Sequence, residues 1–196
     1  MAATTELREE RKEARRRRLL EAALKTFAEI GYYDTSVDMI VAEAHTSKTT
    51  FYEFFQSKED CVRDILAREG GELIYRVVTE AAQGTDHRER MRRGIRAFVM
   101  ACAERRQLAR VLLFESVGVS PEIEAVRHNL HGKFAHVVAE EVRRAQGSDE
   151  FYAAVDPEIF GRAVVGAVNE ATGASLSQRD SDPEQLAAGL CAIFAP

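Results

Sequence analysis

The chain has few of the residues that interrupt or cross-link secondary structure. Its 196 residues include only 4 Pro and 12 Gly, too few to punctuate the many short strands of an all-β protein. The 3 cysteines, Cys61, Cys102 and Cys191, are odd in number and far apart, which excludes a disulfide framework and a CxxC-type zinc site. No apolar run approaches the ~18 residues that span a bilayer, and no signal peptide is evident. We therefore expect a cytoplasmic protein with reduced cysteines and no membrane partner.

The residues that are abundant favour helices. Apolar residues make up 45% of the chain and charged residues 30%, enough to build a core. Long segments are rich in Ala, Leu, Glu and Arg, which have high helix propensity. We predict an all-α fold, either as one domain of ordinary size or as a small module joined to a larger one.

Positive charge is concentrated near the N-terminus, although the net charge of the whole chain is -5. Between residues 8 and 18 seven basic residues stand against three acidic ones, a local balance of 7 − 3 = +4. Such a run is either a solvated helix start or an arm that seeks phosphates.

The first 55 or so residues have the pattern of three helices. Leu20, Leu24 and Phe27 share one face of a helix that Gly31 ends. Thr35 or Ser36 can cap a second helix, and Ser47 can cap a short third helix that runs to about Phe55. Two helices joined by a short turn, on a supporting first helix, are the outline of a helix-turn-helix unit.

The third helix has two different faces. Phe51, Phe54 and Phe55 are spaced i, i+3, i+4 and predict a stripe that faces the core. At ~100° per residue, Thr49 points away from that stripe. Thr50 and Tyr52 flank Thr49, Lys48 lies at the edge, and Glu53 also faces outward. Hydroxyl and ammonium groups of this kind donate to phosphates and base edges.

Residues after about Ser57 predict further helices, separated by breaks at Gly-, Ser- and Pro-containing segments. The expected ranges are 58–83, 86–105, 106–117, 121–146, 156–178 and 183–194. Gly70-Gly71 mark either a kink in the first of these helices or a bend without function. The last two helices are rich in apolar and small residues, including glycines at 161, 166 and 173. They pack either against a second copy of the chain or within an ordinary intrachain core.

The middle helices are candidates for a ligand cavity, because apolar side chains there are accompanied by a few polar ones. The candidate ligand-binding residues are Phe98, Cys102, Phe114, His131, Phe134 and Asn169. Plain core packing is the alternative for each. Glu124, His128 and His131 share a helix face and form a candidate metal site. Exposed polar residues on a surface helix are the preferred interpretation, so we expect no metal and no cofactor.

Residues 31–60 resemble the DNA-binding segment of the TetR family of transcriptional repressors. The resemblance rests on Phe27 and Gly31 closing the first helix, Thr35-Ser36 opening the second, Ile40 and residues 42–44 within it, and then Ser47-Lys48, Phe51-Tyr52, Phe55 and Ser57-Lys58-Glu59. The chain departs from the family at His45 and Thr49, where glycines are common, and at Thr46, where an apolar residue is usual. Because His reaches a positive φ more readily than most residues, we expect the turn to persist.

The resemblance implies a fold, a function and a set of DNA-contacting residues. The fold is all-α with about nine helices: a helix-turn-helix domain over residues 1–56 and an effector-binding and dimerisation domain over residues 57–196. The implied DNA-binding residues are Arg17, Arg18, Thr35, Ser36, Thr46, Ser47, Lys48, Thr49, Thr50, Tyr52 and Lys58. The implied function is that of a homodimeric regulator, expected to be a repressor, which binds a near-palindromic operator in double-stranded DNA and is released by a small-molecule effector.

Two other classes remain as alternatives. A metal-dependent enzyme would have to use Glu124, His128 and His131, since the chain contains no Gly-rich phosphate loop, nucleophile elbow or HExxH motif. A helical ligand-binding protein without operator binding is the other. We expect that the protein is not an enzyme.

Overall fold

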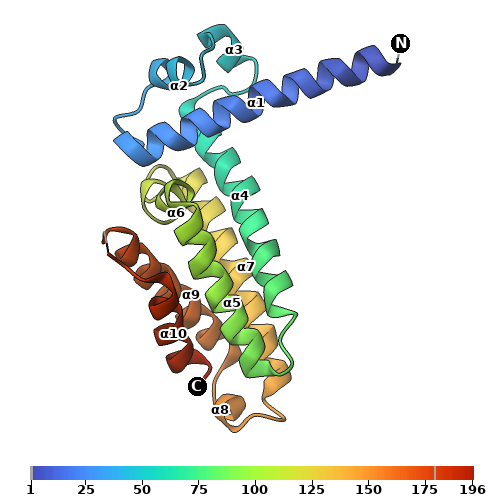
Figure 1. Cartoon of the computed structure of the whole chain (residues 1–196), viewed down its shortest axis with the longest axis vertical. Coiled ribbons are helices and arrows are strands. Elements are labelled where there is room, and N and C mark those ends of the chain that lie inside the picture. The colour runs from blue at the N-terminus through green and yellow to red at the C-terminus, as the bar shows by residue number, and fades with distance from the viewer. Residues whose placement is uncertain (1, 179) are drawn as a thin grey trace.

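The computed structural model describes residues 2–178 and 180–196, with side chains from Leu7 onward. In this part of the chain there are ten α-helices, one π-helix and no strand, so the all-α prediction is confirmed (Figure 1). The elements are α1 (Ala2–Ile30), α2 (Val37–Glu43), α3 (Lys48–Tyr52), α4 (Lys58–Ala81), α5 (His87–Glu104), α6 (Arg106–Arg110), the π-helix η1 (Val111–Glu115), α7 (Pro121–Ala145), α8 (Glu150–Ala153), α9 (Pro157–Leu176) and α10 (Pro183–Phe194). None of the described helices is both long enough and apolar enough to cross a membrane.

Helices α1, α2 and α3 form a small head at one end of the molecule (Figure 1). Leu19, Phe27, Ile40 and Phe51 are almost completely buried between these helices and the start of α4. The same apolar cluster continues into Leu108 and Ile123, which belong to the larger part of the chain. The head is therefore packed directly onto the helices that follow it.

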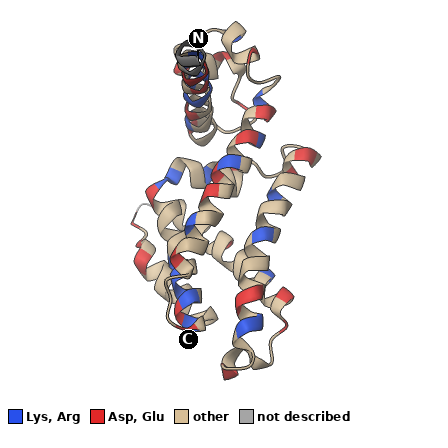
Figure 2. Cartoon of the chain, turned by 90° about the vertical axis from the view of Figure 1, so that its right-hand side faces the viewer, with Lys and Arg blue, Asp and Glu red and all other residues tan. Residues whose placement is uncertain are grey.

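The remaining helices form an elongated bundle in which α7 packs against α4 and α9, and α5 packs against α4 and α10 (Figure 1). Phe98, Val99, Cys102 and Val142 lie in the core of this bundle. Charged residues of both signs are scattered along its helices (Figure 2). Burial of the apolar faces, at about 25 cal/mol per Å² of apolar surface removed from water, holds the bundle together.

Several glycines of the bundle permit close packing. A Cβ at Gly161 would lie 2.3 Å from the carbonyl oxygen of Ala135, so α7 and α9 approach each other there without intervening side chains. A Cβ at Gly173 would lie 2.8 Å from the ring of Phe114, and one at Gly70 would lie 2.7 Å from Leu130. Helix α4 runs without interruption through Gly70, which makes room for a side chain of α7. Of the three glycines in α9, only Gly166 has open space beside it.

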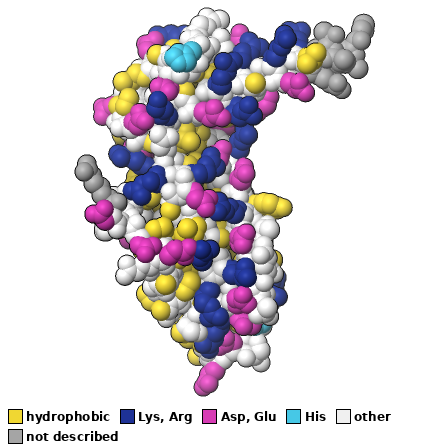
Figure 3. Space-filling model, in the orientation of Figure 1, with side chains coloured by type: hydrophobic (Ala, Val, Ile, Leu, Met, Phe, Trp, Pro, Cys, Tyr) yellow, Lys and Arg dark blue, Asp and Glu magenta, His cyan; other side chains and the backbone are white. Residues whose placement is uncertain are grey.

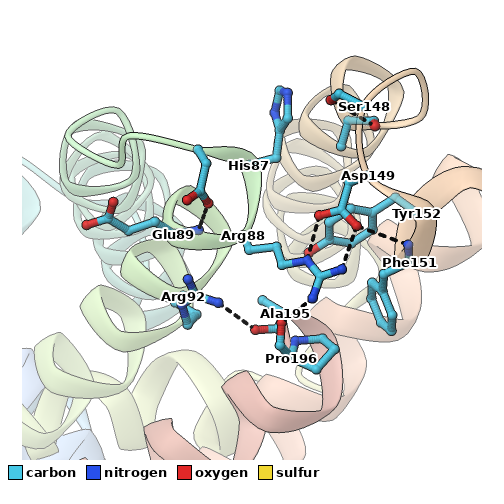
Figure 4. Close-up of polar contacts among 12 residues, drawn as sticks. His87, Arg88, Glu89, Arg92, Ser148, Asp149, Phe151, Tyr152, Ala195 and Pro196 are labelled. Atoms are coloured by element: carbon cyan, nitrogen blue, oxygen red, sulfur yellow. Dashed lines mark hydrogen bonds and ion pairs between the residues drawn. The ribbon is translucent and has the colours of Figure 1, made fainter.

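The short helix α8 is not among the ranges predicted from the sequence. Helix α8 is held in a cluster of polar contacts beside the ends of α5 and α10 (Figure 4). The guanidinium of Arg88 donates to both carboxylate oxygens of Asp149 at 2.6 and 2.7 Å. The hydroxyl of Tyr152 donates to the carbonyl of Phe194 at 2.9 Å, and Arg92 donates to the carbonyl of Ala195. These contacts fasten α10 to α5 and α8.

Candidate DNA-binding face and effector cavity

The second helix begins at a side-chain cap, as the sequence predicts. The hydroxyl of Ser36 accepts a hydrogen bond from the backbone N–H of Met39, which satisfies one of the free donors in the first turn of α2. Thr35 has a different role from the one implied by the family resemblance. Its side chain is buried, and its hydroxyl donates to the carbonyl of Gly31 at 2.7 Å. Thr35 therefore fixes the loop before α2 and does not present a hydroxyl to phosphate.

The turn between α2 and α3 persists with His45 in the usual glycine position. His45 has a φ of 49°, so the predicted left-handed conformation is confirmed. The backbone N–H of Thr46 donates to the carbonyl of Val41 at 2.9 Å and closes the turn. The next residue, Ser47, caps α3 by accepting from the backbone N–H of Thr50 at 3.1 Å. Local hydrogen bonds thus set the angle at which α3 leaves the turn.

Helix α3 turns Phe51 inward and its hydroxyl-bearing side outward. Phe51 and Phe55 are buried, whereas Phe54 is only half-buried. Thr49 is exposed, and Tyr52 is also exposed, with 56% of its surface accessible to solvent. The predicted orientation of α3 is confirmed, because Thr49 and Tyr52 face solvent while Phe51 is buried. The predicted end near Phe55 was wrong: α3 ends at Tyr52, and Phe55 is buried just beyond it.

Two charged pairs lie beside this exposed face. The ammonium of Lys48 pairs with Asp38 of α2 at 2.8 Å, which raises the pKa of Lys48. The carboxylate of Glu53, at the end of α3, lies 4.0 Å from the guanidinium of Arg15 in α1. Arg15 therefore partly offsets the acidic group that faces outward from α3.

Lys58 lies in a cage of backbone carbonyls. Its ammonium donates to the carbonyls of Tyr32 (2.7 Å), Tyr33 (3.1 Å) and Thr35 (2.7 Å), and it lies 4.5 Å from the centre of the Tyr32 ring. Burial lowers the pKa of Lys58. All three N–H donors of the ammonium are occupied. A hydrogen bond to phosphate, as implied by the family resemblance, would have to replace one of them.

The other implied DNA contacts differ in exposure. Ser36, Ser47 and Arg18 are exposed, while Thr46 and Thr50 are half-buried. Arg17 is exposed but lies 3.8 Å from Glu21, on a different face of α1 from Arg18. The basic run of residues 8–18 lies within α1, which agrees with a helix start, one of the two interpretations of this run.

Three neighbouring cavities lie in the described part of the bundle, and each of the six candidate ligand-binding residues lines at least one of them. We call the first, of about 450 Å³, the chamber; it lies between α4, α5, α7 and α9 and is lined mainly by apolar side chains, including Phe98 and Phe134. The second, of about 30 Å³, forms a neck that includes Cys102 and His131. The third, of about 710 Å³, lies beside α7 and α9 and includes Phe114. Asn169 lines all three.

The rim of the chamber carries charges that the sequence analysis missed. The carboxylate of Glu141 accepts from or pairs with three groups: His87 at 2.7 Å, Arg90 at 3.6 Å and Arg144 at 3.5 Å. Two guanidinium groups thus share one carboxylate. Glu140 also lines the chamber, so two carboxylates stand beside the two guanidinium groups at the rim. Residues far apart in the sequence form this rim, so no local motif marks it.

The candidate metal residues engage other partners. Glu124 binds Arg127 and accepts from the backbone N–H of Gly118, and these contacts lower its pKa. His128 contacts the carbonyl of Glu124, and His131 lies 3.3 Å from the amide nitrogen of Asn169. Among the residues that the structure describes, no group of three or more His, Cys, Asp or Glu side chains could hold a metal ion.

A capped helix-turn-helix head on a helical body that contains an apolar chamber defines a class of DNA-binding regulators. Comparison with known proteins identifies the family. Residues 19–65 match the family described as "Bacterial regulatory proteins, tetR family", and residues 84–173 match "Tetracyclin repressor-like, C-terminal domain". The chain belongs to the TetR family of helix-turn-helix transcriptional regulators, which are not enzymes.

The chain is similar to the uncharacterized HTH-type transcriptional regulator YdgC of Bacillus subtilis, with 28% identity over 178 residues that cover 88% of this chain and 87% of the relative. Its fold is similar to that of FadR of Bacillus subtilis in complex with stearoyl-CoA, with a TM-score of 0.83, 18% identity and coverage of 91% and 96% of the two chains. It is also similar to AibR in complex with isovaleryl coenzyme A and operator DNA, with a TM-score of 0.75, 21% identity and coverage of 93% and 98%. At these identities the two solved structures establish the shared fold alone.

Proposed function

We propose that this regulator acts in the cytoplasm as a homodimeric repressor that binds a near-palindromic operator and releases it when a small molecule fills the chamber. The observation that carries the proposal is the outward face of α3. Thr49 and Tyr52 are exposed there while Phe51 is fully buried, so hydroxyl groups are available for DNA on a helix fixed from behind.

Dimerisation through α9 and α10 is supported by an exposed face of small and apolar residues. Ile159 and Ile193 are 70% and 63% exposed, and Gly166 and Gly189 have no atom near the position of a Cβ. Ala163, Ala188 and Ala192 are exposed on the same two helices. Pairing two copies would remove this surface from water and present two α3 helices to one duplex, about 34–36 Å or a multiple apart.

The effector class that fits best is a molecule with an apolar chain and an anionic group, such as a fatty acyl-CoA or a free fatty acid. The chamber wall offers mainly apolar side chains, and its rim offers the guanidinium groups of Arg90 and Arg144 beside the carboxylates of Glu140 and Glu141. FadR and AibR, which share the fold, were solved with acyl-CoA ligands. The effector would shift the dimer toward a head spacing that does not fit the operator. The free energy of this shift can be no larger than the difference in the effector's binding free energy between the two states.

Operator binding is tested by selecting duplexes from a random DNA library with the full-length protein. We expect enrichment of a near-palindromic sequence. Replacement of Thr49 by Ala should change the preferred base at one position in each half-site more than it changes overall affinity. If no sequence were enriched, the alternative of a helical ligand-binding protein without operator binding would be favoured. Equal losses on all sequences would remove Thr49 from the readout face.

The effector class is tested by thermal unfolding with stearoyl-CoA, isovaleryl-CoA, stearate or coenzyme A alone. A ligand at 100 times its Kd adds about 2.7 kcal/mol of stability, which for a chain of this size corresponds to roughly 5–10 °C in Tm. Gly94 lines the chamber, and a Cβ there would make only ordinary contacts with Ala81 and Val77. Gly94→Leu should therefore fold but lose the ligand shift, whereas Gly71→Leu, which faces open space, should keep it. A rise in Tm with coenzyme A alone, or one that survives Gly94→Leu, would contradict a chamber that holds the apolar chain of the ligand.

A further inference from the structure

The N-terminal part of α1 projects beyond the rest of the head (Figure 1). Its C-terminal part packs through Leu19, Ala23 and Phe27, which are buried. The described side chains before Leu19 are exposed, except for the half-buried Ala14 and Arg16. About half of this helix is thus free of the core, and hydrophobic packing does not account for its length.

The charges on this projecting helix are segregated by sign. At about 100° per residue, five basic residues fall within one sector of about 120° and four acidic residues within the opposite sector. We call the basic set the basic stripe; its members are Arg8, Arg11, Lys12, Arg15 and Arg18. The acidic set consists of Glu9, Glu10, Glu13 and Glu21, and Arg17 lies among these. In Figure 3 the Lys and Arg side chains gather along one edge of the projecting helix.

Ion pairs show which way the acidic sector and the basic stripe face. Arg15 of the stripe lies 4.0 Å from Glu53 at the end of α3. Beside the stripe, Lys25 donates to Glu43 of α2 at 2.8 Å. In the acidic sector, Glu13 pairs with Arg68 of α4 at 3.6 Å. The basic stripe is therefore on the side of α1 that adjoins α2 and α3, and the acidic sector is on the side of α4.

This orientation places the stripe next to the readout face of α3. Glu53 is one helical turn beyond Thr49 and, like Thr49, is exposed. A duplex that met Thr49 and Tyr52 would continue past Glu53 and Arg15 toward Arg8. From Arg8 to Arg18 the helix rises ~15 Å at 1.5 Å per residue, which is the length of about four base-pair steps of 3.4 Å.

We propose that the basic stripe of α1 lies along the phosphates of the DNA that flanks each half-site, and so extends the contact beyond the operator bases read by α3. Flanking duplex DNA fits this surface because its negative charges are closely and regularly spaced and need no base recognition. The inference rests on the proposed operator binding. It differs from the assignment implied by the family resemblance, because it includes Arg8, Arg11 and Lys12 and leaves out Arg17.

The test compares two single substitutions that remove the same charge from the same helix on opposite faces. Arg11→Gln removes a charge from the basic stripe, whereas Arg17→Gln removes one from the acidic sector. Each variant is titrated with the selected operator in two lengths: a duplex that ends at the half-sites, and one extended by ten base pairs on each side. The slope of log affinity against log salt concentration is measured for both duplexes, with helix content checked by circular dichroism.

On the extended duplex, Arg11→Gln should reduce the slope by about 0.9, the value for one phosphate contact. The triple change Arg8→Gln, Arg11→Gln and Lys12→Gln should reduce it by roughly 2–3 for the same reason. Arg17→Gln should leave the slope unchanged, and all variants should match the wild type on the short duplex. Equal changes of the salt slope in Arg11→Gln and Arg17→Gln, or equal reductions of the slope on both duplexes, would overturn the proposal. A change in oligomeric mass that explains the reduced slope would also overturn it.

Failure of operator recognition gives a different result. If the wild type enriches no sequence, a random-sequence 40-base-pair duplex at low salt takes the place of the extended operator. The contrast between Arg11→Gln and Arg17→Gln should persist there, because phosphate contacts do not depend on sequence. Absence of the contrast on this duplex too would reject the phosphate role of the basic stripe on its own.

Discussion

The carboxylate of Glu115 accepts a hydrogen bond from the backbone N–H of Tyr32 at 3.2 Å. Glu115 ends the π-helix η1 of the bundle, whereas Tyr32 belongs to the loop that leads into α2. Nearby, the hydroxyl of Tyr33 donates to the carbonyl of Gly118 at 2.8 Å. Through Lys58, the same loop is also fixed to α4. The loop before α2 is thus a junction at which a shift of η1 or α4 can reach the DNA-binding head.

The first prediction concerns this junction. Glu115→Gln keeps the shape of the side chain but replaces a charge-assisted acceptor, which also pairs with Arg110 at 3.1 Å, by a neutral one. We expect the ratio of the operator affinity without effector to the affinity with effector to fall toward one. This ratio measures the allosteric coupling, which is typically about 1–3 kcal/mol. The affinities are measured by fluorescence anisotropy with labelled operator.

Glu104→Gln is the matched control for Glu115→Gln. It removes the charge of a carboxylate that pairs with Arg76, between α4 and α5. We expect the affinity ratio to stay at its wild-type value in this variant. An equal fall in both variants would mean that loss of any bundle ion pair has the same effect, and Glu115 would then have no special part in the coupling.

The second prediction separates two lysines near the head. Lys58→Met removes the donor shared by three carbonyls and should lower the free energy of unfolding by about 2 kcal/mol, the range for hydrogen bonds to a charged group. It should leave the salt dependence of DNA binding unchanged. Lys48→Ala should reduce the salt slope by about 0.9, the value for one phosphate contact. A reduced slope in Lys58→Met would restore the phosphate contact implied by the family resemblance.

The third prediction concerns strain at His45. A non-glycine residue in the left-handed region costs about 1–2 kcal/mol, while glycine adds roughly 0.5–1 kcal/mol of backbone entropy to the unfolded chain. His45→Gly should therefore stabilise the protein by about 0.5–1 kcal/mol in urea unfolding. His136→Gly, at a helical position in α7, should destabilise it by roughly 1 kcal/mol. The same sign for both changes would show that the turn is not strained.

The fourth prediction concerns the exposed face of α9 and α10. Gly189→Arg places a charged side chain on this face where a Cβ meets no atom, so the monomer should fold normally. In a dimer that buries the face, an unpaired charge is costly. We expect Gly189→Arg to sediment as a monomer at concentrations where the wild type is a dimer. Gly71→Arg, also in open space on a helix, should remain dimeric. A dimer of unchanged affinity in Gly189→Arg would place the interface elsewhere.

Local patterns predicted much of the head and the limits of most helices. The caps at Ser36 and Ser47, the inward side of Phe51 and Phe55, and the left-handed His45 all depend on residues a few positions apart. The cage around Lys58 and the rim around Glu141 depend on groups 23 to 26 and up to 54 residues away, so no sequence pattern marks them. Helix α8 was missed because its four residues are too few for helical periodicity to be detected.

The last prediction concerns His131, which lies at the neck of the cavities. The amide nitrogen of Asn169 lies 3.3 Å from its Nε2, and because an amide N–H₂ can only donate, His131 accepts there in its neutral form. Burial lowers the pKa of His131, and the neighbouring charges of Arg127 and His128 lower it further against the opposing effect of Glu124. In the folded state His131 therefore resists protonation more than it does in the unfolded chain.

The sign of the pH dependence follows from this difference. Below the unfolded pKa of about 6.5, the unfolded chain binds more protons than the folded one, so this contribution to stability is complete above that pH and is lost as the pH falls toward the lowered folded pKa. In urea unfolding between pH 7.5 and 5, His131→Gln should reduce the fall in stability, by at most about 1.4 kcal/mol per pH unit, the limit for one proton. His136→Gln, an exposed imidazole on the same helix, should leave the fall in place. If the pH dependence of His131→Gln matched that of the wild type, the neutral His131–Asn169 pair would not contribute to it.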